Sequence, residues 1–443
     1  MTLAYGIDFG TSNSSVGICD EAGPRLLPIQ NGATSVPTAL FFSFDDDSTH
    51  FGHEALECCF ARESGRYLRA IKSLLGTKLF EEATQVKRKR YGFDEIIAAY
   101  LGFLRSSAGE TLAAPPTSVV LGRPAFFVDD DPAADAKAER QLAAAARAAG
   151  FEQIAFQFEP IAAALDYEQS VRSEQIAFVA DIGGGTSDFS VVRVSPERAR
   201  SSDRRQDILA CAGVHIGGTD FDRQLALAKV MPALGLRSAL SRDGLNAPSW
   251  HFHDLATWHR IGILYDPKVL SEVRAILRDS AEPAKIKRLL AVLEQHKGHE
   301  LLAAVEAAKI ELSQAELAVL ELDGGADLAL EITRPELETA VASSLHRIAS
   351  RIEEVLRMAG LGPDDVSAVF LTGGATTMPL VRQAIAAAIP NDRLIAGDVF
   401  GSVAKGLALD AKTRFADQGN IETQRSYPAV SGFGVGDFSP SPQ

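Results

Sequence analysis

Apolar runs of strand length alternate along this chain with stretches in which apolar side chains recur at helical spacing. Short apolar runs bounded by turn residues predict strands, and a period near 3.6 residues predicts amphipathic helices. We expect strands at 3–7, 15–18, 119–121, 154–158, 176–180, 189–194 and 366–371, and helices at 61–75, 94–107, 132–149, 161–167 and 379–389. This alternation favours an α/β fold over an all-α or all-β fold.

The helix at 132–149 has the clearest ends. Asp131 can cap its N-terminus, Pro132 suits its first turn, and Gly150 suits the position just past its end.

The pattern changes twice along the chain. Residues 223–320 are mostly helical in period, and 418–443 are rich in Gly, Ser and Pro without any period. The length of 443 residues allows two to four lobes. We expect a first lobe at 1–168, a second lobe at 169–412 with 223–320 as an added helical subdomain, and a polar tail at 413–443.

Two glycine-containing runs of similar chemistry stand between predicted strands, IDFGT at 7–11 and DIGGGTSD at 181–188. Each predicts a hairpin whose turn exposes backbone N–H groups to a phosphate. An aspartate entering each turn suits a hydrated divalent cation, and a hydroxyl residue follows the glycines. A single run is equally consistent with an ordinary hairpin. Two copies favour facing hairpins that clamp a triphosphate.

Two further sites lie where a predicted strand gives way to a helix. Glu159 precedes Pro160 at such a switch, where its carboxylate can face a cleft. Gly373 and Gly374 follow the strand at 366–371, and backbone donors before a helix suit a phosphate or a ribose.

Charge and cysteine content narrow the possible partners. The formal net charge of −14 disfavours nucleic acids and anionic membranes, and the basic run at 87–90 is too short to reverse this. The four cysteines show neither a disulfide framework nor zinc-ribbon spacing. The chain shows neither a signal peptide nor a membrane-spanning run, so we expect a cytoplasmic protein.

Six motifs, in this order, resemble the nucleotide-binding domain of the 70 kDa heat-shock chaperones. They are GIDFGT (6–11), IKSLLG (71–76), FEPIAAA (158–164), DIGGGTSD (181–188), HIGGTDFD (215–222) and TGG (372–374). The resemblance covers about residues 3–412 and is greatest to short bacterial members of the YegD type. It implies the actin-like ATPase fold of the actin and sugar-kinase superfamily. That fold has two lobes, each with a duplicated mixed five-stranded sheet flanked by helices, and binds ATP or ADP with Mg²⁺ in the cleft between them.

The resemblance also implies roles for individual residues. Asp8, Glu159 and Asp181 would hold hydrated Mg²⁺, the last two acting also in catalysis, and Lys72 would orient the attacking water. The alternatives are that Lys72 is a solvated lysine on an amphipathic helix and Glu159 an acid at a helix N-terminus. Implied phosphate contacts or nucleotide contacts are Gly10, Thr11, Ser12, Asn13, Gly183, Gly184, Gly185, Thr186 (also catalytic), Asp188, Gly217, Gly218, Gly373, Gly374 and Asp398.

The nucleoside end departs from the family pattern. Glu306, Lys309 and Ser313 share one helical face and match the family's ribose and adenine contacts, although a solvated helix face would look the same. Ile310 and Thr377 stand where the family has arginines that stack on adenine. We therefore expect weaker or less selective nucleotide binding.

We expect a chaperone-like ATPase that couples ATP hydrolysis to lobe closure. The alternatives are a small-molecule kinase of the sugar-kinase type and a nucleotide-gated scaffold with negligible turnover. Only the polar tail follows Ala411, so we expect no peptide-clamping domain. An unfolded protein or a co-chaperone is a possible partner, and the oligomeric state stays open.

Overall fold

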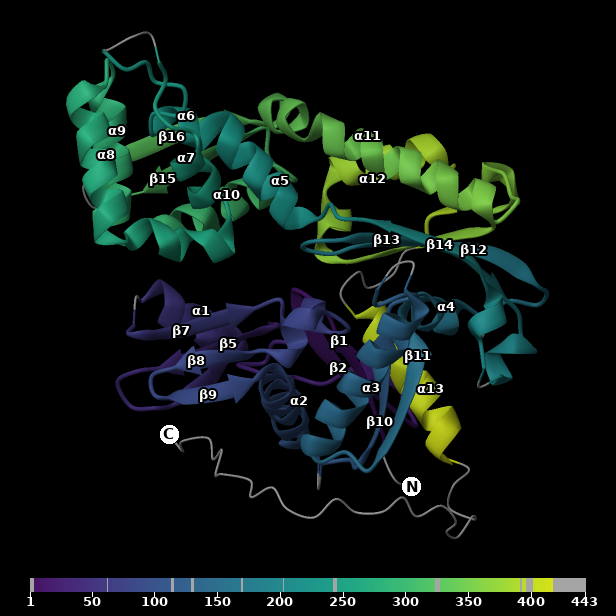
Figure 1. The fold of residues 1–443 in the computed structure, drawn as a ribbon. Coiled ribbons are helices and arrows are strands. Elements are labelled where there is room, and N and C mark those ends of the chain that lie inside the picture. The colour runs from purple at the N-terminus through teal and green to yellow at the C-terminus, as the bar shows by residue number, and fades with distance from the viewer. Residues whose placement is uncertain are drawn as a thin grey trace.

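Two mixed β-sheets form the centres of the lower and upper halves of Figure 1. The computed structural model describes residues 4–416 except 62, 113–114, 129–130, 169, 202, 242–244, 323–326, 391–392 and 396–400. Most of the predicted tail and Asp398 lie outside the described residues.

The first sheet has the strand order β11-β10-β1-β2-β3, and β4 also pairs with β2. Strand β1 runs antiparallel to β2 and parallel to β10, which in turn runs parallel to β11. The strands are β1 (Ala4–Phe9), β2 (Asn13–Asp20), β3 (Gly23–Leu26), β4 (Ser35–Pro37), β10 (Ser118–Arg123) and β11 (Gln153–Phe158).

The second sheet repeats this arrangement in the order β14-β13-β12-β17. Strand β12 runs antiparallel to β13 and parallel to β17, and a parallel bridge joins Val369 to Leu394 beyond them. The strands are β12 (Gln175–Ile182), β13 (Ser187–Val194), β14 (Ile208–Val214) and β17 (Ala368–Thr372). The expected duplication is confirmed, but the strand count differs from five in each sheet. Within the described residues the first sheet has six strands, and the second has four plus the bridge.

Helices cover both sheets (Figure 1). Helices α2 (Phe93–Gly109) and α3 (Pro132–Ala148) share an apolar core with the first sheet, in which Ile7 and Tyr100 are fully buried. Helices α11 (Arg334–Met358) and α12 (Pro379–Ala388) share a core with the second. As predicted, Asp131 caps α3 by accepting hydrogen bonds from Ala133 N and Ala134 N.

Helices α4 (Glu159–Glu168) and α13 (Ser402–Ala416) connect the two halves. Their apolar side chains form one cluster with residues of both sheets, among them Val120 and Val179. Helix α13 packs on the first sheet, although the sequence placed 402–412 with the second lobe. The other lobe boundaries stay predictions.

Glycines let α13 approach its neighbours at backbone distance. A Cβ on Gly6 would lie 2.2 Å from Ala408 N, and one on Gly17 would lie 2.6 Å from Ala404 O. A Cβ on Gly406 would lie 1.9 Å from Ala162 O of α4. Any side chain at these positions forces the layers apart.

The predicted helix at 61–75 is wrong. Strand β7 (Gly65–Arg69) pairs with β5 (Ala39–Ser43), and only a 3₁₀ turn, η1 (Ile71–Leu74), follows. Between them Ala70 is left-handed, with φ 56°. Pairing with β5 outweighs the local helical period.

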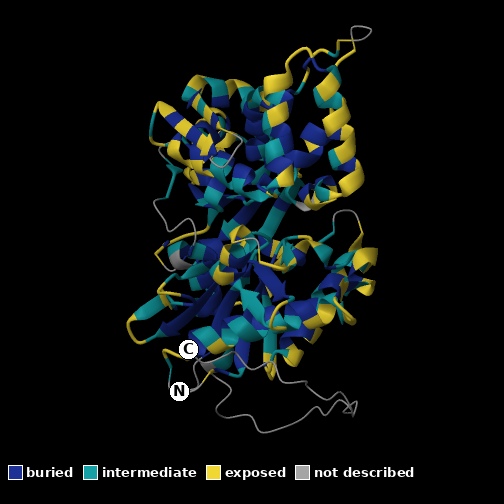
Figure 2. Cartoon of the chain, turned by 90° about the vertical axis from the view of Figure 1, so that its left-hand side faces the viewer, coloured by how far each residue is buried: buried dark blue, intermediate teal, exposed yellow. Residues whose placement is uncertain are grey.

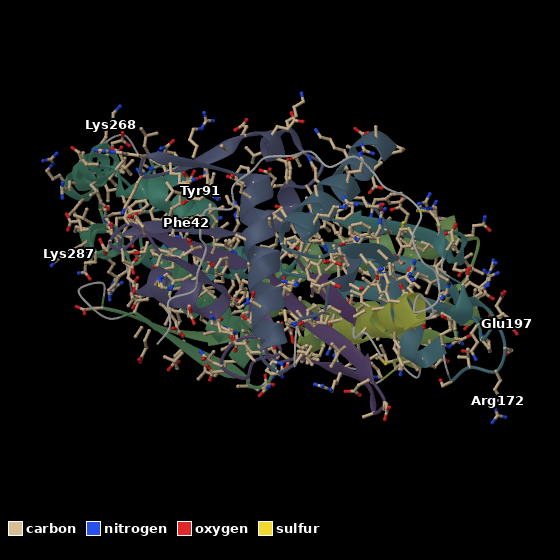
Figure 3. The ribbon with its side chains drawn as sticks, turned by 90° about the horizontal axis from the view of Figure 1, so that it is seen from below. Phe42, Tyr91, Arg172, Glu197, Lys268 and Lys287 are labelled. Carbon is tan, nitrogen blue, oxygen red and sulfur yellow. The ribbon has the colours of Figure 1, made fainter. Side chains whose placement is uncertain are left out.

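Several small elements complete the first half. Strand β6 (Thr49–Phe51) and helix α1 (Gly52–Phe60) adjoin β5, and β8 (Ala83–Val86) forms a hairpin with β9 (Lys89–Gly92). Stacking of Phe42 on Tyr91, with ring centroids 4.9 Å apart, ties this hairpin to β5, and Figure 3 labels both rings.

The second half carries the expected helical region. Its elements are α5 (Gly218–Leu225), a π-helical turn η5 (Ala226–Val230), α6 (Met231–Ala233), α7 (Trp250–Leu255), a 3₁₀ segment η6 (Trp258–Tyr265), α8 (Pro267–Asp279), α9 (Pro283–Glu294), α10 (Gly298–Glu311), β15 (Leu317–Leu322) and β16 (Leu328–Thr333). Buried residues follow the strands of both halves, and exposed ones gather on the outer helices (Figure 2). Among the described helices, none has both the length and the apolar character needed to cross a bilayer.

Candidate functional site

Both glycine motifs form the turns of antiparallel hairpins, as predicted. In the first, Phe9 pairs with Ser14, and Thr38 supports the turn by donating from Oγ1 to Gly10 O at 2.8 Å. In the second, Ile182 pairs with Ser187, and Gly183 N donates to Thr186 O at 2.9 Å. Sequence reasoning missed Thr38, because no motif marks a residue that supports a turn from another strand.

The two turns face and touch one another. A Cβ on Gly184 of the second turn would lie 2.0 Å from Ser12 Oγ of the first. The two glycine turns therefore meet where the two halves come together.

The start of α5 lies against the second turn. Gly218 N donates to Gly183 O at 2.9 Å, and Thr219 donates to Gly184 O from both N and Oγ1 at 2.7 Å. A Cβ on Gly217 would lie 2.5 Å from the backbone of Gly184. The predicted pair Gly217 and Gly218 thus joins the loop residues, and it brings a helix N-terminus with it.

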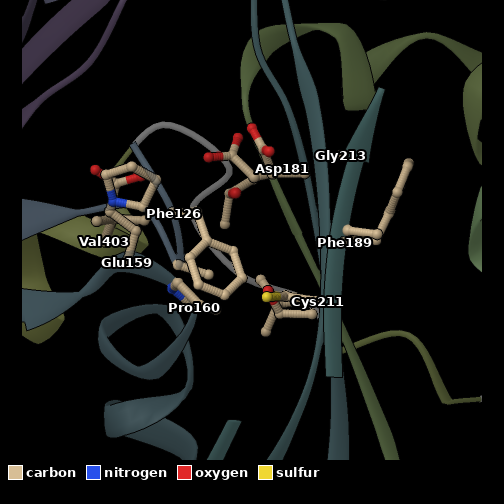
Figure 4. Close-up of a pocket in the computed structure, with 15 residues that line it drawn as sticks. Phe126, Glu159, Pro160, Asp181, Phe189, Cys211, Gly213 and Val403 are labelled. Atoms are coloured by element: carbon tan, nitrogen blue, oxygen red, sulfur yellow. The ribbon is translucent and has the colours of Figure 1, made fainter. Parts of the chain in front are cut away.

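Three carboxylates converge beside these turns from three elements. Asp8 lies near the end of β1, Glu159 begins α4 and Asp181 lies near the end of β12. Figure 4 shows Glu159 and Asp181 on the wall of one pocket between the halves.

The pKa values of two of these acids are raised, because their carboxylates are buried next to other negative charges. Burial, and then the Glu159 charge, raise the pKa of Asp8 to about 8, with Lys72 acting in the opposite direction. Burial, followed by Glu159 and Asp188, raises the pKa of Asp181 to about 7. A group of acids that destabilise one another's ionised forms suits a divalent cation.

Lys72 places a positive charge next to these three carboxylates. Its Nζ donates to Glu159 Oε1 at 2.6 Å, and the two side chains are only 9% and 12% exposed. Burial lowers the pKa of Lys72, but the carboxylates of Glu159 and Asp8 outweigh it and raise the pKa. The alternative of a solvated lysine on an amphipathic helix is wrong, because Lys72 lies buried in η1.

The TGG motif packs against Asp181 and Ile182 at the end of β12. Gly373 has φ 81°, and a Cβ there would lie 2.4 Å from Ile182 O and 2.8 Å from Asp181 Oδ1. Gly374 begins a 3₁₀ turn, η8 (Gly374–Thr377), which precedes α12. Thr372, which pairs with Asp181 across β17 and β12, lowers the pKa of that acid and was not predicted.

The nucleoside residues are only partly as expected. Lys309 is buried rather than solvated: its Nζ lies 2.8 Å from Asp222 Oδ1 and donates to Gly218 O at 3.2 Å. Asp222 was missed as a partner. Burial raises its pKa to about 6, against the effect of Lys309.

The remaining nucleoside positions are more open. Glu306 is half-buried on α10, and Ser313 follows α10 and donates to Lys309 O at 3.4 Å. Ile310 is 57% exposed. Thr377 is exposed and donates to Gly374 O at 2.7 Å.

The other predicted loop residues lie on the same turns. Thr11 is half-buried, and Asn13 is the exposed first residue of β2. Gly185 and Thr186 lie in the second turn, and the exposed Asp188 pairs in register with Asp181.

Comparison with known proteins shows which family this sequence resembles. The sequence model of the family described as Hsp70 protein matches residues 4–230 and 277–420. The chaperone protein DnaK of Trichormus variabilis is 26% identical over 437 residues, covering 93% of this chain and 54% of that protein. DnaK of Thermus thermophilus is 27% identical, covering 87% and 56%, and DnaK of Metamycoplasma hominis is 26% identical, covering 86% and 54%. The chain thus spans about half the length of the curated relatives it matches.

Proposed function

The chain belongs to the Hsp70 family, and we propose that it binds ATP with Mg²⁺ between its two halves and hydrolyses it to ADP and phosphate. One observation carries the proposal: Ser12 and Gly184, from opposite hairpins, lie against each other, and Asp8 and Asp181 of the strands that lead into these hairpins act on the buried Lys72 that pairs with Glu159.

The turns supply what a polyphosphate needs. Backbone N–H groups of both hairpins and the N-terminus of α5 at Gly217 and Gly218 provide positive dipoles in a chain of strongly negative net charge. Hydroxyls of Thr11, Ser12 and Thr186 add donors for phosphate oxygens. We propose that these groups hold the β- and γ-phosphates.

The carboxylates fit a magnesium ion. Asp8, Glu159 and Asp181 would hold it mostly through its water ligands, which suits the raised pKa values of Asp8 and Asp181. When bound, Mg²⁺ would offset the charge of the phosphates and raise their electrophilicity. Lys72 Nζ, fixed by Glu159, would orient the attacking water and stabilise the charge on the γ-phosphate.

Closure of the halves would couple ATP hydrolysis to the binding of a partner protein. Helices α4 and α13 share one apolar cluster with both sheets, so a change at Glu159, the first residue of α4, reaches both halves. We propose an unfolded protein or a co-chaperone as the partner. The exposed Ile310 and Thr377 support weak discrimination among nucleotide bases.

Phosphate release from purified protein tests the proposal. With Mg²⁺ and ATP we expect slow, steady release that requires no sugar or other acceptor, and that EDTA abolishes. Release only on addition of a phosphate acceptor would instead favour the kinase alternative. ATP binding without release would favour a nucleotide-gated scaffold.

A further inference from the structure

A cation–π contact joins the two halves, and its aromatic partner lies outside the residues that the family model matches. The guanidinium carbon of Arg69, on β7 of the first half, lies 5.0 Å from the ring centroid of Trp258 on η6 of the second. Trp258 lies in residues 231–276, between the two matched segments. The aromatic partner of the contact therefore lies in a part of this chain that the family model does not match, whereas Arg69 lies in a matched part.

The contact lies beside the nucleoside residues. The ring centroids of Trp258 and His299 lie 5.3 Å apart. His299 lies at the start of α10, the helix that also carries Glu306 and Lys309. Burial lowers the pKa of His299 and the Arg69 charge adds to this, whereas burial raises the pKa of Asp222 and the Arg69 charge acts against it. Two elements of the second half, η6 and α10, thus face the end of β7.

Tyr67 is a second residue of β7 whose side chain lies near the second half. Burial raises the pKa of Tyr67 to about 12, and the charges acting on it include Arg69 of its own strand and Glu306 of α10. The end of β7 is therefore an interface with the second half, and Arg69 supplies its positive charge.

Arg69 is also only three residues from Lys72. The intervening Ala70 is left-handed, a conformation that costs a non-glycine residue free energy, and Ile71 is buried. Arg69 and Lys72 are thus joined by a short turn with a buried anchor, through which a shift at Arg69 would reach Lys72 and its partner Glu159.

We propose that Arg69 and Trp258 form a latch that holds η6 on the first half and fixes the position of Lys72. Arg69 is then a positioning residue: it acts on the reaction through Lys72, and it slows nucleotide release by keeping the halves together. The kinetic part rests on the proposed nucleotide binding, whereas the contact itself does not.

Nucleotide dissociation tests the kinetic part. With a fluorescent ADP on the full chain, we expect Arg69→Gln and Trp258→Leu each to speed dissociation about tenfold, which corresponds to about 1.4 kcal/mol. The double variant should match the single ones within about twofold, because both break one contact. Trp258→Phe keeps an aromatic face and should stay within about threefold of wild type.

A matched control separates the latch from general effects of charge. Arg66→Gln removes an exposed arginine from the same strand and should leave dissociation unchanged. Single-turnover hydrolysis should slow about fivefold in Arg69→Gln and not in Arg66→Gln. Additive effects in the double variant, or equal effects of Arg66→Gln, would overturn the latch.

Tryptophan fluorescence tests the contact without nucleotide. The chain has two tryptophans, so Trp250→Phe leaves Trp258 as the only emitter. In that background Arg69→Gln should increase acrylamide quenching of Trp258, and Arg66→Gln should not. If wild type binds no nucleotide, the proposed function fails and the quenching result alone decides on the contact. Unchanged quenching would overturn the latch itself.

Discussion

Lys72 and Glu159, 87 residues apart in sequence, form a nearly buried ion pair of 2.6 Å. One comes from a 3₁₀ turn and the other from the first residue of a helix, and Asp8 and Asp181 act on the pKa of Lys72 as well. The pair therefore places one cation among three acids. In the proposed function, Lys72 both neutralises part of this acidic group and interacts with the bound phosphate.

Replacing Lys72 should separate binding from turnover. Lys72→Ala removes the charge proposed to orient water and stabilise the γ-phosphate, so we expect kcat to fall by about 10²–10³-fold. The nucleotide Kd should stay within about threefold, because the loops are intact. Phosphate release and calorimetry measure the two quantities.

The exposed Lys78 offers the control for that variant, since Lys78→Ala should change neither quantity. Equal losses of affinity and turnover in Lys72→Ala would contradict the role given to Lys72.

Gly217 should be indispensable for the second turn, and Gly185 should not. A Cβ on Gly217 would meet the Gly184 backbone at 2.5 Å, whereas one on Gly185 meets nothing within 4 Å. We expect Gly217→Ala to weaken ATP affinity at least tenfold and Gly185→Ala to change it less than threefold, as measured by calorimetry. If both variants bind alike, the contact between α5 and the turn is irrelevant to binding.

The acidic group should make the nucleotide-free chain less stable as pH rises. Burial, and then the Glu159 charge, raise the pKa of Asp8 in the folded protein to about 8 from its ordinary value of 3.8, so the folded state favours the protonated form. The stability that protonation contributes is complete below about pH 4 and is lost as pH rises through 8. In EDTA, Asp8→Asn should be about 2 kcal/mol more stable than wild type at pH 8.5, and this gain should shrink toward pH 5.

Urea unfolding at several pH values measures this difference. Asp20→Asn is the control, because Asp20 is a more exposed acid whose pKa a hydrogen bond from Arg25 lowers, so its effect should not change between pH 6 and 8.5. If the free energies of unfolding of Asp8→Asn and wild type depend on pH in the same way, folding does not disfavour the ionised form of Asp8.

Replacing each of two helical glycines by alanine should change the free energy of unfolding in opposite directions. A Cβ on Gly406 of α13 would lie 1.9 Å from Ala162 O, whereas one on Gly102 of α2 would meet nothing within 4 Å. Gly406→Ala should lower the free energy of unfolding by about 3 kcal/mol through overpacking, and Gly102→Ala should raise it by about 0.5–1 kcal/mol through helix propensity. Urea unfolding measures both changes. Stabilisation by both variants would contradict the packing of α13 on α4.

The sequence predicted the features that local motifs determine. The hairpins at Gly10 and Gly184 and the capped helix α3 follow from turn chemistry. The grouping of Glu159 with Asp181 was implied by the family resemblance, and strand order indicated only that Glu159 can face a cleft. The strand at 65–69 was missed because pairing with β5 outweighs its helical period.

Contacts between distant segments escaped prediction. Nothing local marks Asp222 as the partner of Lys309, Thr38 as the support of the first turn, or Arg69 as the neighbour of Trp258. The first two relationships arise only when distant segments of one half fold together, and the third only when the two halves meet, and their residue types are common on any surface.

Calorimetric titration of ATP into the nucleotide-free chain, with Mg²⁺ and then with EDTA, tests the central claim most directly. The account predicts one site per chain, with an affinity that falls at least tenfold when Mg²⁺ is removed. Absence of binding, or an affinity independent of Mg²⁺, would contradict a nucleotide held between the facing turns and the three acids.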